Sequence, residues 1–478
     1  MRNSLILAGG LAILTSCGVN KQLEQNRQSL AVPTQVNGIA VDTSKAYVAP
    51  TIGSFFADPG LADLYNRMKS SNLDYKIVEE RIAIANQYLR RTKMAFIPSL
   101  EARISGQGTR YGKYTIDGVG NYDTNLSQNI EDDQRVNENI TPDMYLGLQA
   151  SWEIDIWGKL RNQKKAAQQQ FFATQEGLQL LQIEIFTNIA TLYYELIALD
   201  KQLQIYSDNL ALQERASEIV MAQRSTGKAT ELAVQSFLAQ NNNLKAAVEA
   251  IKADIFEKER AILALTGEFN GSVNRSTSFI QGQLDYLNAT HNVDTIIHAR
   301  PDVNKAYLEY GAAMSKVKAA RAAFYPRLEI GGFIAMNAFN PKTWFNPSSL
   351  AFQFLGNLVA PIFSKGELTT QFNITTAEQN IAFIEYRKSV LQAYNELSAM
   401  LNQLDANQKV LEFKGAEVSY LERGVEVAND LYVTGYANYL EIITAQKSKL
   451  QAQLEFVDYQ LRSSKALVRL FKAMGGRM

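Results

Sequence analysis

Two long helical patterns near the C-terminus are separated by the stretch TGYANYL at residues 434–440. The stretch TGKATEL at residues 226–232 separates an earlier pair, and both share the spacing Thr-Gly-x-Ala-x-x-Leu. A glycine that closes one helix, followed by a small polar residue that opens the next, is typical of the turn in an antiparallel helical hairpin. The sequence therefore predicts two copies of one unit, each with a hairpin tip at this motif.

The composition favours long helices and gives no sign of a charged partner. Of the 478 residues, 46% are apolar, and 48 Lys and Arg balance 48 Asp and Glu, so there is no reason to expect nucleic acid or an anionic surface as a partner. None of the ten prolines lies between Pro142 and Pro301 or after Pro361, so two stretches lack the strongest helix breaker. The helical run from Lys159 to Arg224 would extend roughly 100 Å, longer than a globular core needs.

The N-terminus has the features of a bacterial lipoprotein signal. A basic start precedes the apolar run from Leu5 to Leu14, and small residues lead to Cys17, the only cysteine. This pattern resembles the lipobox, in which the signal peptide, here residues 1–16, is removed and the cysteine is acylated. The alternative is an ordinary secreted protein with an incidental cysteine. Residues 17–58 are expected to form a lipid-anchored extended arm, and no transmembrane helix is expected in the mature chain.

Residues 59–267 form the first predicted repeat: a helix, a β-hairpin at 99–156 and a long helical hairpin at 158–267. Asp58 is placed to cap the first helix, and the helical pattern continues to Phe96. In the β-hairpin, apolar and polar residues alternate over two segments that are long enough to cross a membrane as strands. The alternative is a half-buried hairpin in a soluble domain, but aromatic residues near one end favour the membrane.

A polar connector, residues 268–299, leads to the second repeat at 300–475. That repeat comprises a helix, a β-hairpin at 327–361 and a long helical hairpin at 365–475. The first β-hairpin has the longer outer loop, a polar, Gly-rich and acidic segment, and outer loops tolerate insertions well. The same plan therefore occurs twice in the chain.

The two repeats together predict four strands, too few to close into a barrel. Lipid tolerates no open strand edge, because no water is present to satisfy the unpaired backbone groups. If these strands cross a membrane, other subunits have to cover both edges. The pattern therefore predicts an obligate homo-oligomer, without fixing the number of subunits.

With these features, the chain resembles the outer-membrane efflux proteins, the TolC-like exit ducts, and among them the lipoprotein branch that serves resistance-nodulation-division pumps. The resemblance covers essentially the whole mature chain. Besides the internal duplication, five segments carry it. They are the lipobox, FFADPGL at 55–61, FYPRL at 324–328, PIFSKG at 361–366 and the second tip at 434–446.

The resemblance implies a mixed membrane α/β fold that is completed by three copies of the chain. In this homotrimer, four transmembrane β-strands per chain would form a twelve-stranded β-barrel in the outer membrane of a Gram-negative bacterium, continued by a long periplasmic α-helical barrel. Acylated Cys17 would lie in the outer-membrane lipid. The implied partners are an inner-membrane resistance-nodulation-division pump and a periplasmic adaptor, which would contact the hairpin tips at Thr226, Gly227, Thr434 and Gly435.

In relatives, an apolar ring and acidic residues just after the second tip glycine close the periplasmic end of the duct. The corresponding residues here are Leu440, Glu441 and Thr444, with threonine where relatives frequently carry aspartate. Three Glu441 carboxylates near the axis would attract cations. The alternatives are a solvated charge on the helix surface for Glu441 and ordinary helix packing for Leu440.

The sequence contains no recognisable motif for catalysis or cofactor binding. It lacks a Gly-rich phosphate loop and a Ser or Cys nucleophile motif, so no enzymatic activity and no cofactor are expected. His291 and His298 lack the further ligands of a metal site and are expected to be surface residues. We therefore predict a passive exit duct of a tripartite efflux pump. The alternatives are a duct for protein or peptide export, as in type I secretion, and a periplasmic coiled-coil scaffold lipoprotein, which would have no use for membrane strands.

Overall fold

The computed structural model describes residues 47–137, 139–280 and 293–478. The predicted signal peptide, Cys17, most of the predicted arm and His291 lie outside these residues. The described chain divides into two compact units, and each combines segments of both repeats. The first unit comprises Ile84–Phe171 and Glu309–Ala382, and the second comprises residues 47–83, Phe172–Leu308 and Phe383–Met478.

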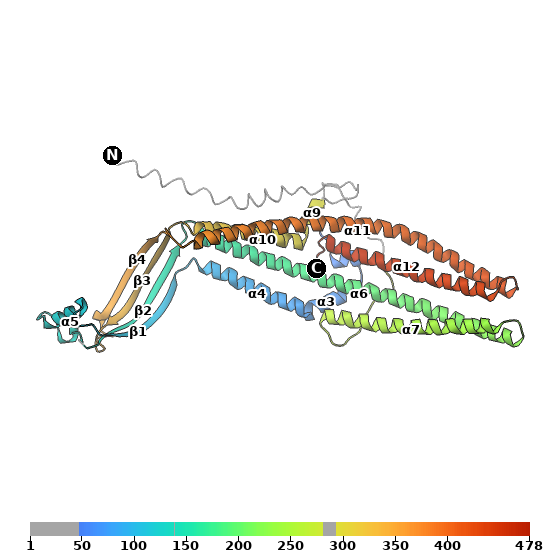
Figure 1. Ribbon diagram of the computed structural model, residues 1–478, viewed down its shortest axis with the longest axis horizontal. Helices are drawn as coiled ribbons and strands as arrows, with labels where there is room; N and C mark the ends of the chain where they lie inside the picture. Colours follow the sequence, from blue (N-terminus) through green and yellow to red (C-terminus); the bar gives the residue numbers. More distant parts are fainter. Residues whose placement is uncertain (1–46, 138, 281–292) are drawn as a thin grey trace, which may run out of the picture. The chain divides into compact units, whose positions relative to one another are not determined.

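The first unit contains a four-stranded sheet in the order β1-β2-β3-β4 (Figure 1). Its strands are β1 (Ser99–Thr109), β2 (Thr141–Ile154), β3 (Arg327–Ala338) and β4 (Leu350–Val359). Every neighbouring pair is antiparallel. Each repeat contributes one hairpin, the pairing of β2 with β3 joins the two, and β1 and β4 are left as the edge strands.

The register places the apolar residues of all four strands on one face of the sheet. Three rows across the strands are Leu100-Ala150-Gly332-Phe354, Ala102-Leu148-Ile334-Phe352 and Ile104-Leu146-Met336-Leu350. The opposite face is largely polar on β1 and β2, where Glu101 lies opposite Gln149. The alternation predicted from the sequence is thus in phase across both hairpins, and it gives the sheet one continuous apolar face.

The connection between β1 and β2 contains a helix where the sequence indicated a loop. Helix α5 spans Ile116–Leu126, and the 3-10 turn η1 (Asp132–Gln134) follows it. The Thr115 hydroxyl caps α5 by accepting a hydrogen bond from Gly118 N (3.1 Å). Glycines and acidic residues give this segment the composition of a loop, and the local cap favours the helix. The shorter connection between β3 and β4 contains the 3-10 turn η2 (Pro347–Ser349).

Two matching junctions connect the sheet to the long helices. After β2, the Asp155 carboxylate accepts hydrogen bonds from two backbone N–H groups in the first turn of α6 (Lys159–Ser225), at 3.0 and 2.9 Å. Gly158 lies in the left-handed region with φ 80°, as Gly366 does with φ 83° before α11 (Glu367–Val433). Because glycine adopts this conformation without the clash that a Cβ would cause, both repeats turn at the same point.

The second unit is built from helices (Figure 1). It contains α2 (Ile52–Phe56), α3 (Pro59–Ser71), α7 (Glu231–Thr266), α9 (Val293–Ala299) and α12 (Tyr439–Ala473), with segments of α4 (Leu73–Met94), α6, α10 (Pro301–Ala322) and α11. Within the described residues, no helix combines the length and the apolar character that crossing a membrane requires.

An aromatic cluster forms the centre of the second unit's core. Phe55 and Phe56 of α2 pack against Phe186 of α6 and Phe471 of α12, with ring centroids 5.0–5.8 Å apart. All four side chains are at most 5% exposed. The cluster therefore joins the N-terminal segment, the first repeat and the C-terminal helix in one apolar core.

One helix predicted from the sequence is divided in two at Asn72. The pattern indicated a continuous helix to Phe96, whereas α3 ends just before Asn72 and α4 begins just after it. The Asn72 side chain accepts a hydrogen bond from Tyr75 N (2.8 Å) and donates one to Leu265 O of α7 (2.7 Å). Because this side chain competes with the helix for backbone groups and also contacts α7, the helix is interrupted here.

Candidate functional site at the hairpin tips

The first hairpin tip joins α6 to α7. After the last turn of α6, Gly227 takes the left-handed conformation (φ 77°) that allows the chain to reverse. Thr230 then caps α7 by accepting a hydrogen bond from Ala233 N (3.2 Å). The Thr226 hydroxyl donates to Gln223 O (2.9 Å), which ties this residue to the end of α6. The tip therefore has a defined, locally stabilised geometry.

The second tip repeats this geometry between α11 and α12. Gly435 is again left-handed, with φ 85°. Asn438 caps α12 by accepting hydrogen bonds from Leu440 N (2.9 Å) and Glu441 N (3.3 Å). The Thr434 hydroxyl donates back to a carbonyl of α11 at 2.9 Å. Both tips thus reverse the chain at a left-handed glycine and begin the next helix with a polar cap. The capping residue is Thr230 at the first tip and Asn438 at the second.

A small apolar cluster packs the two tips together within the second unit. Ile443 of α12 lies against Val220 of α6 and Phe237 of α7, and all three are nearly buried. Tyr439, the first residue of α12, packs on the same cluster. The ends of both hairpins lie at the same end of this unit in Figure 1. The first turn of α12 is therefore anchored to the first hairpin.

The three predicted gate residues are all exposed in the first turns of α12. Leu440 is 60% exposed, so it does not have the helix-packing role within its own chain that the sequence left open. The Glu441 carboxylate accepts a hydrogen bond from Asn438 Nδ2 (3.3 Å), and the Thr444 hydroxyl donates to Leu440 O (2.8 Å). The three side chains face away from the core of the chain.

Ile442 and Ile443 are the packing residues of this turn, with 5% and 8% of their surface exposed. Sequence reasoning missed both, although two adjacent apolar residues among polar ones indicate the buried side of an amphipathic helix. It also missed Tyr432 of α11, whose hydroxyl donates a hydrogen bond to Gln223 Oε1 of α6. No local pattern connects these last two residues, because they belong to different hairpins.

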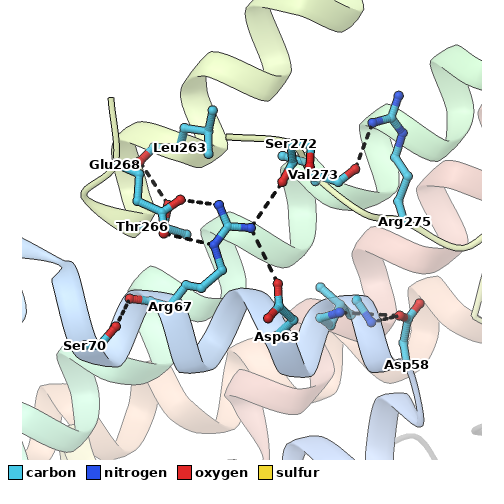
Figure 2. A network of polar contacts seen from close by, with 12 residues as sticks. Asp58, Asp63, Arg67, Ser70, Leu263, Thr266, Glu268, Ser272, Val273 and Arg275 are labelled. Carbon is cyan, nitrogen blue, oxygen red and sulfur yellow. Dashed lines mark hydrogen bonds and ion pairs between the residues drawn. The ribbon is translucent and has the colours of Figure 1, made fainter. Parts of the chain in front are cut away.

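A polar network fixes α3 to the end of α7 and the connector (Figure 2). Arg67 of α3 forms an ion pair with Glu268, just after α7, and donates a hydrogen bond to Ser272 O (3.2 Å). Asp63, one turn earlier on α3, lies 3.5 Å from the same guanidinium. The hydrogen bond from Arg67 lowers the pKa of the Glu268 carboxyl, and Glu268 raises the pKa of Arg67.

The contacts of Asp58 account for the aspartate and the glycine in the motif FFADPGL at residues 55–61. Its carboxylate accepts hydrogen bonds from Gly60 N (2.8 Å), from the Tyr193 hydroxyl (2.9 Å) and from Ser276 Oγ (3.0 Å). A Cβ at position 60 would lie 2.6 Å from the Tyr193 oxygen, so the site requires glycine. Burial, with the nearby Asp58 as a smaller cause, raises the pKa of Tyr193 to about 12, so the hydroxyl remains a donor.

The prediction that His298 is a surface residue is wrong. It is 8% exposed, with Nε2 3.2 Å from the Tyr386 hydroxyl and Nδ1 2.8 Å from Asp294 O. Two neighbours on α9, Ile296 and Ile297, are also buried. Both ring nitrogens of His298 nevertheless have a polar partner, as buried polar groups require. In the described part of the chain, no group of three or more His, Cys, Asp and Glu residues could hold a metal ion.

The fold matches that of outer-membrane channels of known structure. A crystal structure of CusC aligns over 94% of this chain and 100% of its own, with a TM-score of 0.79 and 22% identity. The outer membrane protein VceC from Vibrio cholerae aligns over 89% of this chain and 99% of its own, with a TM-score of 0.78 and 21% identity. At these identities, the likeness establishes the fold.

Sequence comparison establishes the family. The chain matches the profile of the family described as "Outer membrane efflux protein" over residues 64–268 and 292–476. The "Probable outer membrane lipoprotein SilC" of Salmonella typhimurium is 24% identical over 99% of this chain and 98% of its own length. The "Cation efflux system protein CusC" of Escherichia coli K12 is 23% identical over 97% of both. The chain belongs to the outer membrane efflux protein family.

This membership confirms the predicted family and the location in the outer membrane. The chain is an outer-membrane component of an efflux system, and its family is one of channels rather than of enzymes.

Proposed function

We propose that three copies of the chain form one duct, which conducts efflux substrates passively across the periplasm and the outer membrane. The observation that carries this proposal is the four-stranded sheet, which has one apolar face and two edge strands. In lipid, an open edge leaves backbone groups without partners. Pairing of β4 in one copy with β1 in the next would satisfy both edges, and three copies would close a barrel of twelve strands.

The exposed side chains of the edge strands support this assembly. Leu100 and Ile104 of β1 are 69% and 70% exposed, and Phe352 and Phe354 of β4 are 70% and 88% exposed. Such a concentration of large apolar side chains on a single chain marks a surface for a partner or a membrane. Lipid contact on the apolar face and strand pairing at the edges account for both features of the sheet.

We also propose that the hairpin tips receive a periplasmic adaptor, which links the duct to an inner-membrane resistance-nodulation-division pump. The adaptor would contact Thr226 and Gly227 at the first tip and Thr434 and Gly435 at the second, and all four are exposed. The name of SilC as a probable outer membrane lipoprotein supports an acyl anchor at Cys17.

The names of several relatives state what those proteins transport. They include a cation efflux system protein, a solvent efflux pump outer membrane protein and a pyoverdine export outer membrane protein. Cargoes with such different chemistry favour a duct that selects weakly, with the selection made in the pump. A wide passive duct needs no tight binding site for its cargo.

The gate of this duct is proposed to lie at the second tip. Leu440, Glu441 and Thr444 are exposed on a turn that Ile443 anchors. In a threefold assembly, three copies of each would surround the axis. The leucines would supply an apolar constriction and the Glu441 carboxylates a negative ring, whereas the Thr444 hydroxyl, which already donates to Leu440 O, would add no charge.

Gel mobility of the detergent-extracted protein, with and without boiling, tests the assembly. We expect a trimer that persists in detergent and dissociates to single chains on heating, because pairing of the edge strands between copies would close the barrel. A monomer or an elongated dimer that is extracted by water alone would contradict the proposal. Loss of labelling by radioactive palmitate in Cys17→Ala, with wild type labelled, tests the lipid anchor separately.

A further inference from the structure

A cavity of about 350 Å³ lies between the two helical hairpins of the second unit, close to their tips. Residues of α6, α7, α11 and α12 line it, so each hairpin forms one side. Much of the lining is apolar: Leu212, Ile219, Phe237, Leu244, Ile442 and Leu450. This size and character are those of a site for a small molecule.

Two amide side chains at the cavity have buried atoms without a hydrogen-bond partner in the described part of the chain. Gln213 of α6 is 4% exposed, and its Nε2 group has no acceptor. Gln446 of α12 presents a buried Oε1 atom that has no donor. Native proteins rarely leave such groups unpaired, because their desolvation is then not compensated. A ligand that accepts a hydrogen bond from Gln213 and donates one to Gln446 would satisfy both.

The charged residues that line the cavity are all cations: Arg215, Lys447 and Lys449. No carboxylate lines it, and none of the three cations forms an ion pair with a residue that the structure describes. Just outside the cavity the pattern differs, since Lys245 pairs with Glu214 at 3.0 Å. The charged part of the lining is therefore positive only, and this favours an anionic occupant.

We propose that this cavity binds a small amphipathic organic anion, with a carboxylate or sulfonate at one end of an apolar ring system and a hydroxyl or amine donor at the other. The acidic group accepts a hydrogen bond from Gln213 Nε2 and lies within the field of Lys447 and Lys449. The donor reaches Gln446 Oε1, and the ring system contacts the apolar lining. Binding in this cavity is separate from conduction through the duct and does not depend on it.

An occupant of the cavity has a structural consequence. It contacts α6 and α7 on one side and α11 and α12 on the other, so it favours the arrangement of the two hairpins in which the cavity exists. A ligand stabilises the state that it binds in proportion to its occupancy. We therefore expect the ligand to raise the thermal midpoint of the helical signal as well as to bind.

The test uses 6-hydroxy-2-naphthoate, which carries a carboxylate and a hydroxyl on an apolar ring system, and the full-length protein in detergent. Calorimetric titration, with protein-free micelles as the blank, is expected to show one saturable site per chain. The neutral analogue 2-naphthol keeps the ring and the hydroxyl but lacks the carboxylate, and we expect it to bind about tenfold or more weakly. No saturable binding, or equal binding of 2-naphthol, would overturn the proposal.

Variants of the lining locate the site. Lys447→Gln combined with Lys449→Gln, and separately Gln213→Leu, are each expected to raise the Kd for the naphthoate about tenfold. The matched control is Lys252→Gln on α7, which removes a cation that pairs with Glu249 at 2.7 Å and lies outside the cavity, and its Kd should stay within about twofold of wild type. Unchanged binding in the lysine and Gln213 variants, with trimer recovery equal to wild type, would show that the naphthoate binds elsewhere and would refute the assignment.

Discussion

The hydroxyl of Tyr432, in the last turn of α11, donates a hydrogen bond to the side-chain oxygen of Gln223 near the end of α6. The two residues belong to different hairpins and different repeats, so this bond joins the two tips directly. The cluster around Ile443 adds an apolar contact between the same two hairpins, here between α12 and the helices α6 and α7. Because the proposed gate residues follow in the first turns of α12, their position depends on this joint.

We predict that Tyr432→Phe loosens the second tip and increases the time that single channels spend in a high-conductance state. A hydrogen bond contributes about 1 kcal/mol, so the population of the open state should rise up to about fivefold. Single-channel recording in planar bilayers measures this. Gln223→Leu should act alike, and the double variant should show no further increase. The control is Tyr420→Phe on α11, where the side chain is 78% exposed. Conductance of Tyr432→Phe identical to wild type would contradict the role of the joint.

Glu441→Gln tests the proposed ring of carboxylates. If three Glu441 side chains surround the axis, their loss should lower the preference of the channel for cations over anions. The effect should be clear at about 0.1 M salt and small at about 1 M, where the Debye length falls to about 3 Å. The measurement is the reversal potential under a salt gradient, with Glu249→Gln on α7 as the control. An unchanged reversal potential would support the alternative of a solvated surface charge.

Gly60→Ala should destabilise the second unit. The added Cβ would lie 2.6 Å from the Tyr193 oxygen, inside the cap that Asp58 organises, and overpacking of this kind costs about 1–3 kcal/mol. The matched control is Gly53→Ala in α2, where a Cβ meets no atom within 4 Å. We expect a lower thermal midpoint of the helical circular dichroism signal for Gly60→Ala alone. Equal midpoints for the two variants would show that the structure relaxes around the new methyl group.

The ion pair between Arg67 and Glu268 predicts a pH dependence. Arg67 lowers the pKa of Glu268 in the folded chain, whereas the unfolded chain has the ordinary value of about 4.3. The stabilisation is therefore complete above about pH 4.3 and is lost as the pH falls through the lowered folded pKa.

For this partly exposed pair we expect a contribution of about 1 kcal/mol or less. Between pH 6 and pH 3, the thermal midpoint of wild type should decrease more steeply than that of Glu268→Gln. The control is Glu249→Gln, which removes an exposed pair on α7 and should follow the wild-type slope. Parallel slopes for wild type and Glu268→Gln would show that the pair does not contribute.

The features that could be predicted from the sequence depend on local chemistry. Gly227 and Gly435 marked the tips because a left-handed residue ends a helix, and Asp58 marked a cap because its carboxylate accepts hydrogen bonds from the N–H groups of Gly60 and Leu61. The strands were predictable because side chains alternate between the two faces. Thr115 is a local signal that was overlooked, since the loop-like composition around it concealed the start of α5.

The features that could not be predicted depend on pairs of residues distant in the chain. Asn72 interrupts a helix partly because Leu265 O lies within reach, and His298 is buried because Tyr386 provides a partner for its ring. The contact of Tyr432 with Gln223 is of the same kind. At the candidate site, the family resemblance located Leu440, Glu441 and Thr444, and the structure adds their exposure, while their role as a gate stays a prediction.

The sheet allows a test at two adjacent residues, Phe354 and Gln353 near the middle of β4. Phe354 lies on the apolar face, opposite Gly332, and Gln353 lies on the other face, opposite Phe333. If the apolar face meets lipid, Phe354→Arg places a charge in the bilayer at a cost of about 2–4 kcal/mol near the midplane, whereas Gln353→Arg points into the water-filled duct. We expect the yield of heat-dissociable trimer in outer membranes to fall about tenfold or more for Phe354→Arg and to stay near wild type for Gln353→Arg. A fall in trimer yield for Gln353→Arg alone would reverse the assignment of the two faces. Trimer yields near wild type for both variants would show that neither face of β4 contacts lipid.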